Sequence, residues 1–177
     1  PTSIEPQFLL RQVVYDLGEQ MSYESFVAGN LLSQHFAMID FNLFDRHNLS
    51  EPQLGGNPWP ILYRNLRDNE TLLQQANGAS SYAVYRGPAL ILKAYIGMLL
   101  TDMYGDVPFF EAARAKEGIT NPRYSLQEDI YNQSNGILSL LEQAVEQIDN
   151  YQGSFALAGD ILFNGDLNQW KKFANSL

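Results

Sequence analysis

Apolar residues recur every three or four positions along much of the chain, the spacing that places side chains on one face of an α-helix. Ser125 and Glu128 have the spacing of an N-terminal capping box, and Pro122 disfavours helix upstream of them. We therefore predict one helix over residues 126–149. Its apolar face would consist of Ile130, Ile137, Leu138, Leu141, Ala144, Val145 and Ile148.

A second helix is predicted over residues 80–103, which are apolar nearly all round, as expected of an element packed on several sides. Gly105 and Pro108 would end it, because glycine readily takes the positive φ of a helix C-cap and proline cannot continue a helix. The longest apolar run, residues 89–100, is shorter than the roughly twenty residues that cross a bilayer. We expect a buried helix there.

Weaker helical patterns cover residues 7–17 and 22–38, and a firmer one covers residues 59–76. Strand patterns are nearly absent, so the predicted fold class is all-α. A last helix carries its apolar face to residue 177 without a C-cap, and we expect residues 1–177 to be the amino-terminal part of a single domain that continues further. The core set of the helix over 59–76 is Trp59, Leu62, Tyr63, Leu66, Leu72 and Leu73.

Composition narrows the classes of partner. The 177 residues carry a formal net charge of -9, which repels the phosphate backbone of nucleic acids, so we expect no nucleic-acid partner. There is no cysteine, and disulfide-stapled folds are therefore excluded. Hydrophobic residues make up 45% of the chain against 18% charged residues, which favours a folded domain.

Little in the sequence points to catalysis, a metal or a cofactor. His35, on a predicted helix, and His47 are the only histidines, too few for a zinc site without cysteine. The oxygen donors around Asp160 and Asp166 do not match a calcium loop, and we interpret them as a turn followed by the N-cap of the last helix. Neither a nucleophile elbow nor a phosphate-binding loop occurs. We expect a binding protein without a cofactor.

Long irregular stretches are predicted at residues 41–58, 109–123 and 151–166, and loops of this length are often functional. The first combines aromatic rings with planar amide, carboxylate and guanidinium groups, which suits the apolar faces and hydroxyls of a sugar. An equally open interpretation is that Phe41 and Phe44 anchor this loop to the core and that Trp59 is itself a core residue. The candidate ligand-binding residues are Asn42, Phe44, Asp45, Arg46 and Trp59.

Three segments resemble the SusD/RagB family of Bacteroidetes outer-membrane nutrient-binding lipoproteins, in its SusD-like 2 branch. They occur in the order found in that family. The segments are the helix start from Trp59 to Leu66, the turn Tyr104-Gly105-Asp106-Val107-Pro108, and Gly159-Asp160 followed by Trp170 and Phe173-Ala174-Asn175-Ser176-Leu177.

This resemblance implies a tetratricopeptide-like helical-repeat scaffold whose turn residues Tyr104, Gly105, Asp106 and Pro108 determine the fold. It also implies a non-catalytic, surface-exposed lipoprotein of the outer membrane that binds an oligosaccharide or peptide and passes it to a SusC-like TonB-dependent transporter. The membrane would be reached only through a lipid anchor that this chain does not contain. Two alternatives stay open: a protein-interaction scaffold without its own sugar site, and a hydrolase with paired carboxylates in a cleft.

Overall fold

Antiparallel α-helices joined by irregular segments form the protein in the computed structural model, which describes residues 4–37, 39 and 58–177. Within those residues there is no strand, and the only β-type pairing is an isolated bridge between Val107 and Ser125. The all-α prediction is confirmed. The helices are α1 (Pro6–Glu24), α2 (Asn30–Leu32), α3 (Trp59–Gly78), α4 (Arg86–Tyr104), α5 (Gln127–Asn132), α6 (Ile137–Asp149) and α7 (Leu167–Ala174), with a π-helical turn at Ser25–Gly29 and 3₁₀ turns at Ser80–Tyr85 and Ala115–Glu117.

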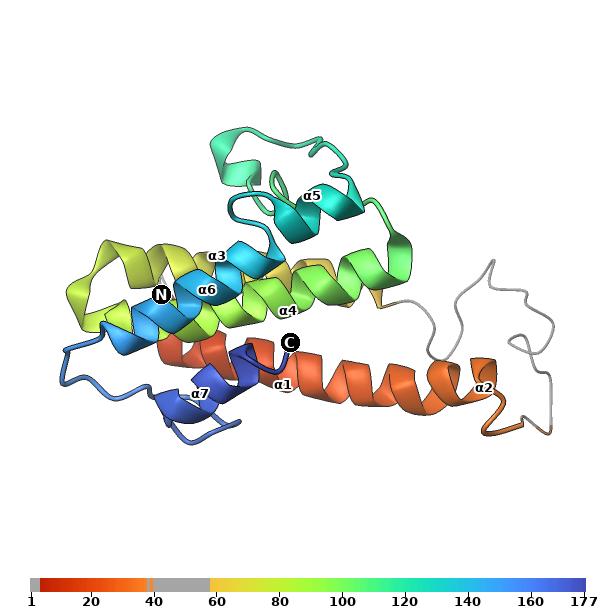
Figure 1. Ribbon diagram of the computed structural model, residues 1–177, viewed down its shortest axis with the longest axis horizontal. Coiled ribbons are helices and arrows are strands. Elements are labelled where there is room, and N and C mark those ends of the chain that lie inside the picture. The colour runs from red at the N-terminus through yellow and green to blue at the C-terminus, as the bar shows by residue number, and fades with distance from the viewer. Residues whose placement is uncertain (1–3, 38, 40–57) are drawn as a thin grey trace.

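The long helices lie side by side and alternate in direction, as Figure 1 shows. α1 packs on α3, α3 on α4, and α4 on α6, while the short α7 packs against both α4 and α6. The start of α3 therefore lies at the same end of the layer as the end of α4. The segment between α4 and α5 forms a separate lobe on one side of the long helices (Figure 1).

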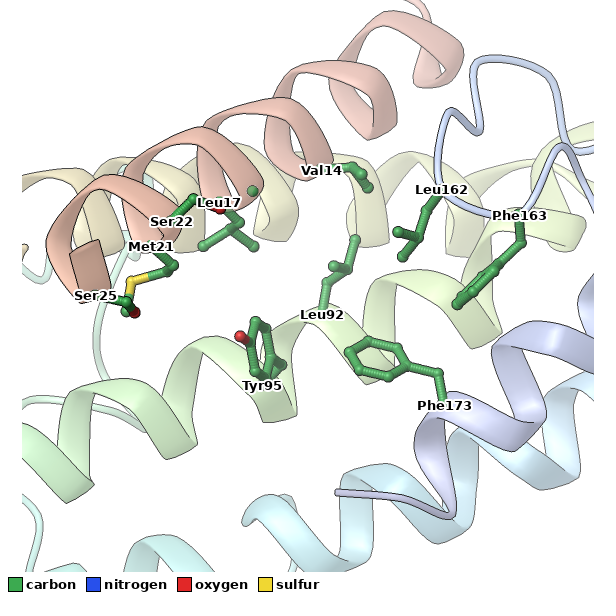
Figure 2. A pocket seen from close by; sticks show the side chains of 11 residues that line it. Val14, Leu17, Met21, Ser22, Ser25, Leu92, Tyr95, Leu162, Phe163 and Phe173 are labelled. Atoms are coloured by element: carbon green, nitrogen blue, oxygen red, sulfur yellow. The ribbon is translucent and has the colours of Figure 1, made fainter. Parts of the chain in front are cut away.

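Between α1, α4 and the segment that leads into α7, apolar side chains face a shared hollow (Figure 2). Met21 and Leu17 come from α1, Tyr95 and Leu92 from α4, and Phe173 from α7. This surface is referred to below as the apolar groove.

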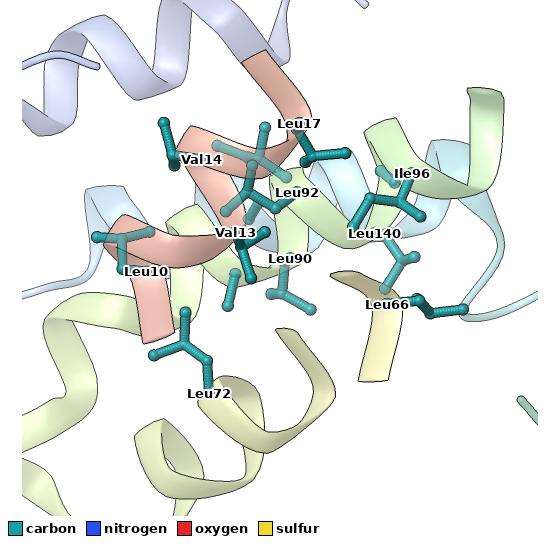
Figure 3. Packing of buried hydrophobic residues seen from close by; sticks show 14 of the residues in the cluster. Leu10, Val13, Val14, Leu17, Leu66, Leu72, Leu90, Leu92, Ile96 and Leu140 are labelled. Atoms are coloured by element: carbon teal, nitrogen blue, oxygen red, sulfur yellow. The ribbon is translucent and has the colours of Figure 1, made fainter. Parts of the chain in front are cut away.

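The core lies where the helices face one another, and α4 contributes to it on several sides (Figure 3). Leu10, Leu66, Ile96 and Leu140, from α1, α3, α4 and α6, are almost completely buried together. The segment Ser80–Tyr104 is long and apolar enough to span a membrane by length and composition alone, but 67% of its most apolar window is buried inside the protein. This segment is therefore part of the core, as predicted.

The predicted separation of two helices at residues 17–22 is wrong. α1 runs without a break through Gly18 and Ser22 and continues through the π-helical turn to Leu32. A single glycine at an open helix position weakens a helix without stopping it, and no proline is present to do so. The helix then ends in a turn where Gln34 has φ 60°, so His35 lies in a bend beyond the helix and not on it.

The predicted single helix over residues 126–149 is also wrong, because residues 133–136 separate α5 from α6. Asn135 has φ 65°, and the Cβ of any larger residue at Gly136 would lie 2.6 Å from the carbonyl oxygen of Ile130. Ser125 does not cap α5, because the N-cap position is Leu126 and has no side-chain cap, and the Ser125 backbone pairs with Val107. The backbone N–H of Gln127 instead donates to Asp106 Oδ1 at 2.9 Å.

The turn after α4 follows the prediction. Gly105 has φ 73°, and the Thr101 hydroxyl donates to its carbonyl oxygen at 2.7 Å. The Gln127 side chain donates to the Thr101 carbonyl oxygen at 3.0 Å, which ties the end of α4 to α5. With Asp106 also holding the start of α5, this turn fixes how the lobe after α4 leaves the helical layer.

The turn before α7 also matches the sequence interpretation. Asp166 caps α7, because its side chain accepts the N–H groups of Asn168 and Gln169. Asp160 lies in the preceding turn and is buried. Within the described part of the chain, no group of three or more His, Cys, Asp or Glu side chains is placed to hold a metal ion.

Candidate functional site

Trp59, the predicted ligand-binding residue that the structure describes, is the first residue of α3. Pro58 precedes it and Pro60 follows it, and proline in the first turn fixes the backbone for a helix start without costing a hydrogen bond. The indole is half-buried and packs against the edge of the main core.

Two tyrosines surround Trp59 and form with it what we call the aromatic end cluster: Trp59, Tyr63 and Tyr104. The ring centroids of Trp59 and Tyr63 are 4.7 Å apart, and those of Trp59 and Tyr104 are 4.9 Å apart in an edge-to-face arrangement. Such pairs stabilise one another by about 0.5–1.5 kcal/mol beyond their burial. Both tyrosines therefore favour one packed position of the Trp59 ring.

Burial keeps the two phenols neutral. The Tyr63 hydroxyl donates to the Pro108 carbonyl oxygen at 2.8 Å. Burial raises the pKa of Tyr63 far above its usual range, and the nearby phenol of Tyr124 adds to this. Burial also raises the pKa of Tyr104, against the opposing effect of a hydrogen bond with the Trp59 backbone. Tyr104 is still 39% exposed, so part of its ring is available to a ligand.

One carboxylate lies near the cluster. Glu24, at the end of α1, is almost fully buried and accepts a 2.6 Å hydrogen bond from the Gln20 side chain. After burial, its charge adds to the raised pKa of Tyr104. The cluster offers the partly exposed rings of Trp59 and Tyr104, which are suited to stacking.

The other predicted site residues, Asn42, Phe44, Asp45 and Arg46, lie outside the described residues, as does His47. Their role stays a prediction, and so does the choice between a ligand loop and a core anchor. Trp59 fits both a core anchor and a ligand contact, because its ring contacts the core and is also partly exposed.

Sequence reasoning missed the partners of Trp59. The periodicity places Tyr63 in the core set, and its position four residues after Trp59 also puts both rings on one helix face. Tyr104 was interpreted only as part of a turn. No local signal links it to Trp59, because the two residues meet only when α3 and α4 pack antiparallel.

The apolar groove is a hollow of about 470 Å³, and Figure 2 shows its side chains converging from α1, α4 and α7. Burial raises the pKa of Tyr95, so this phenol also remains neutral. The hydroxyls of Ser22 and Ser25 are the groove's other polar groups. This lining is suited to apolar contacts.

The whole chain, residues 1–177, matches the SusD-like_2 family model, described as starch-binding and associating with the outer membrane. The chain belongs to the SusD-like family. Its helical layer is therefore the tetratricopeptide-like scaffold of SusD-like proteins, as the sequence resemblance implied. No curated protein matches the chain.

Solved structures agree with the family assignment. A SusD homologue from Bacteroides fragilis has 25% sequence identity and a TM-score of 0.74, and covers 98% of this chain. A SusD/RagB family protein from Bacteroides thetaiotaomicron has 24% identity, a TM-score of 0.74 and 97% coverage. A chitin-binding protein has 23% identity, a TM-score of 0.72 and 97% coverage. The similarity to the last two proteins shows a shared fold.

The SusD-like chain spans about a third of the length of these solved relatives. It covers 34% of the Bacteroides fragilis protein, 36% of the Bacteroides thetaiotaomicron protein and 37% of the chitin-binding protein.

Proposed function

We propose that this chain is the amino-terminal part of a non-catalytic glycan-binding protein of an outer-membrane uptake complex. In this proposal the intact protein is a surface-exposed lipoprotein that captures an oligosaccharide and passes it to a SusC-like TonB-dependent transporter. Membership of a family described as starch-binding and associating with the outer membrane supports both the ligand class and the location. A peptide ligand is the alternative within the same mode of action.

The aromatic end cluster is the single observation that carries the proposal on the structural side. Sugar rings present apolar C–H faces that stack on aromatic side chains, while their hydroxyls need hydrogen-bonding groups nearby. Trp59 and Tyr104 are partly exposed aromatic rings that pack edge to face, with centroids 4.9 Å apart. Asn42, Phe44, Asp45 and Arg46 are proposed to complete the site from the preceding segment.

The test is a binding assay of the intact protein on a panel of glycans that includes starch-type and chitin-type oligosaccharides. Trp59→Ala should weaken binding of the preferred glycan by about tenfold or more, which corresponds to ~1.4 kcal/mol. Phe8→Ala serves as the matched control, because Phe8 is an exposed aromatic residue on α1. It should leave binding unchanged.

A different result would favour the scaffold alternative. If the intact protein binds no glycan, or if Trp59→Ala lowers stability without changing affinity, the aromatic end cluster is a packing feature and the protein acts through other proteins. Release of shortened sugars during the assay would instead favour a hydrolase.

A further inference from the structure

A groove of about 770 Å³, lined by both apolar and charged residues, runs between α3 and the turn at residues 113–117, within the size range of ligand sites. One stripe of α3 forms its first wall: Tyr63, Arg67, Thr71 and Gln74 follow one another at helical spacing. Arg114 and Lys116 lie on the opposite wall. We call this hollow the α3 groove.

The α3 groove is balanced in charge although the chain as a whole is acidic. Its lining carries three basic and three acidic side chains. Arg67 pairs with Asp68 at 2.8 Å, and Arg114 pairs with Glu117. Glu70 pairs with Lys93 at 2.6 Å. The hydrogen bond and the charge of Glu117 raise the pKa of Arg114, and the charge of Glu70 adds to this. A charged ligand gains little from such a lining, whereas a neutral ligand with many hydroxyls meets both donors and acceptors.

Two further features are typical of a ligand site. The Gln75 side chain donates to the Ile4 carbonyl oxygen at 2.9 Å, but its own amide oxygen is buried and has no donor among the described residues. Ala113, in the opposite wall, has φ 61°, a conformation that residues other than glycine rarely adopt. Strained backbone of this kind clusters at ligand sites, where it orients the groups around it.

The α3 groove is continuous with the aromatic end cluster, because Tyr63 belongs to both. From Trp59 to Gln74, α3 rises by about 22 Å, which is long enough for several sugar rings in a row. The half-buried ring of Tyr63 lies between the two ends of this path.

We propose that the α3 groove is an extended subsite for the same glycan chain: sugars beyond the one stacked on Trp59 pass over Tyr63 and are hydrogen-bonded by Arg67, Gln74 and Arg114. This inference rests on the proposed function. It adds a specificity for chain length, since a short oligosaccharide occupies the aromatic end cluster alone and a longer one also fills the groove.

The experiment measures affinities by calorimetry on the intact protein, with maltotriose and maltoheptaose as one short and long pair and chitotriose and chitohexaose as the other. In the pair that binds, the long sugar should bind about tenfold more tightly than the short one. The double variant Arg67→Ala/Gln74→Ala should remove most of this gain and leave the affinity for the short sugar within about twofold. Both side chains are exposed, so the variant should fold normally.

The matched control is Arg11→Ala/Gln12→Ala, which removes the same two residue types from an exposed part of α1. It should keep the full gain for the long sugar. Equal affinity of the wild type for short and long sugars, or a groove variant that keeps the gain, would overturn the extended subsite while leaving the proposed function intact. A groove variant that weakens both sugars equally also overturns it. Binding of neither pair, with tight binding of a peptide instead, would overturn both proposals.

Discussion

The indole N–H of Trp170 donates a 2.8 Å hydrogen bond to Asp160 Oδ2, and both side chains are buried. The same carboxylate accepts the backbone N–H groups of Leu162 and Phe163 through Oδ1 and that of Gly165 through Oδ2. One aspartate thus closes the turn before α7 and holds the most deeply buried tryptophan of the core. A carboxylate is suited to this role because it only accepts, and four donors point at it.

Asp160→Ala should lower the free energy of unfolding by about 3 kcal/mol, because it leaves several N–H groups without an acceptor in a buried place. Asp160→Asn should also destabilise, since its amide presents N–H groups to other donors. Urea denaturation measures the effect. The comparison variant is Asp166→Ala, which removes only the N-cap of α7 and should cost about 1 kcal/mol. Equal losses in the Asp160→Ala and Asp166→Ala variants would argue against the central role of Asp160.

Gly97→Ala should destabilise the protein although alanine is the better helix former. An ideal Cβ at residue 97 would lie 2.6 Å from Cε2 of Phe109, whose ring is almost fully buried. Overpacking of this kind costs about 1–3 kcal/mol, which exceeds the gain of up to about 1 kcal/mol in helix propensity. Thermal or urea unfolding should therefore show a net loss.

The control for Gly97→Ala is Gly18→Ala on α1, where the new Cβ would meet no described atom within 4 Å. That variant should gain about 0.5–1 kcal/mol of stability, because only the propensity difference remains. If both glycine variants stabilise the protein, α4 and the segment after it pack less closely than the structure has them.

Stability at alkaline pH should depend on Tyr131. Burial, a 2.8 Å hydrogen bond to Asp102 and the charge of that carboxylate raise the pKa of this tyrosine to about 12. Between pH about 10 and pH about 12 the unfolded chain loses the phenolic proton while the folded protein keeps it. The unfolded state therefore gains relative to the folded state, and the free energy of unfolding falls as the pH rises through this window.

Urea denaturation at a series of alkaline pH values checks this, with Tyr131→Phe as the variant that cannot ionise. Its stability should fall less steeply than that of the wild type over the window. Asp102→Asn should lower the pKa of Tyr131 part of the way, because it removes the charge but not the burial. Parallel curves for the wild type and Tyr131→Phe would contradict the assignment.

The periodicity of apolar residues predicts the helices that form the core, because the spacing of these residues along the chain determines which face of each helix is buried. Leu62, Leu66 and Leu72 on α3 and Trp170 on α7 are buried as the pattern indicates. Helix ends were predicted less well when distant contacts decide them. Asp106 caps α5 from the other side of a long loop, and this contact exists only after α4 and α5 have come together.

In the candidate site, too, the sequence predicts one part, and the packing of distant helices creates the other. Trp59 stands out in the sequence as an aromatic residue at a helix start after a loop rich in hydrogen-bonding side chains. Tyr104 contacts it because α3 and α4 pack antiparallel, and the α3 groove exists because the turn at 113–117 folds back toward α3. Both are properties of the assembled helices, so spacing along the chain could not reveal them.

Separate substitutions at Tyr63 and Trp59 should distinguish stability from binding. Tyr63→Phe keeps the ring but removes the donor to the Pro108 carbonyl oxygen, so it should cost about 1 kcal/mol of stability and leave glycan affinity within about twofold. Trp59→Ala removes the ring on which the sugar is proposed to stack, so it should weaken binding by about tenfold or more. Calorimetry with the preferred oligosaccharide and urea denaturation give the two readouts for each variant. If Tyr63→Phe weakens binding as much as Trp59→Ala, the phenol must leave Pro108 and contact the ligand directly, and the aromatic end cluster would bind through its hydroxyls as well as its faces.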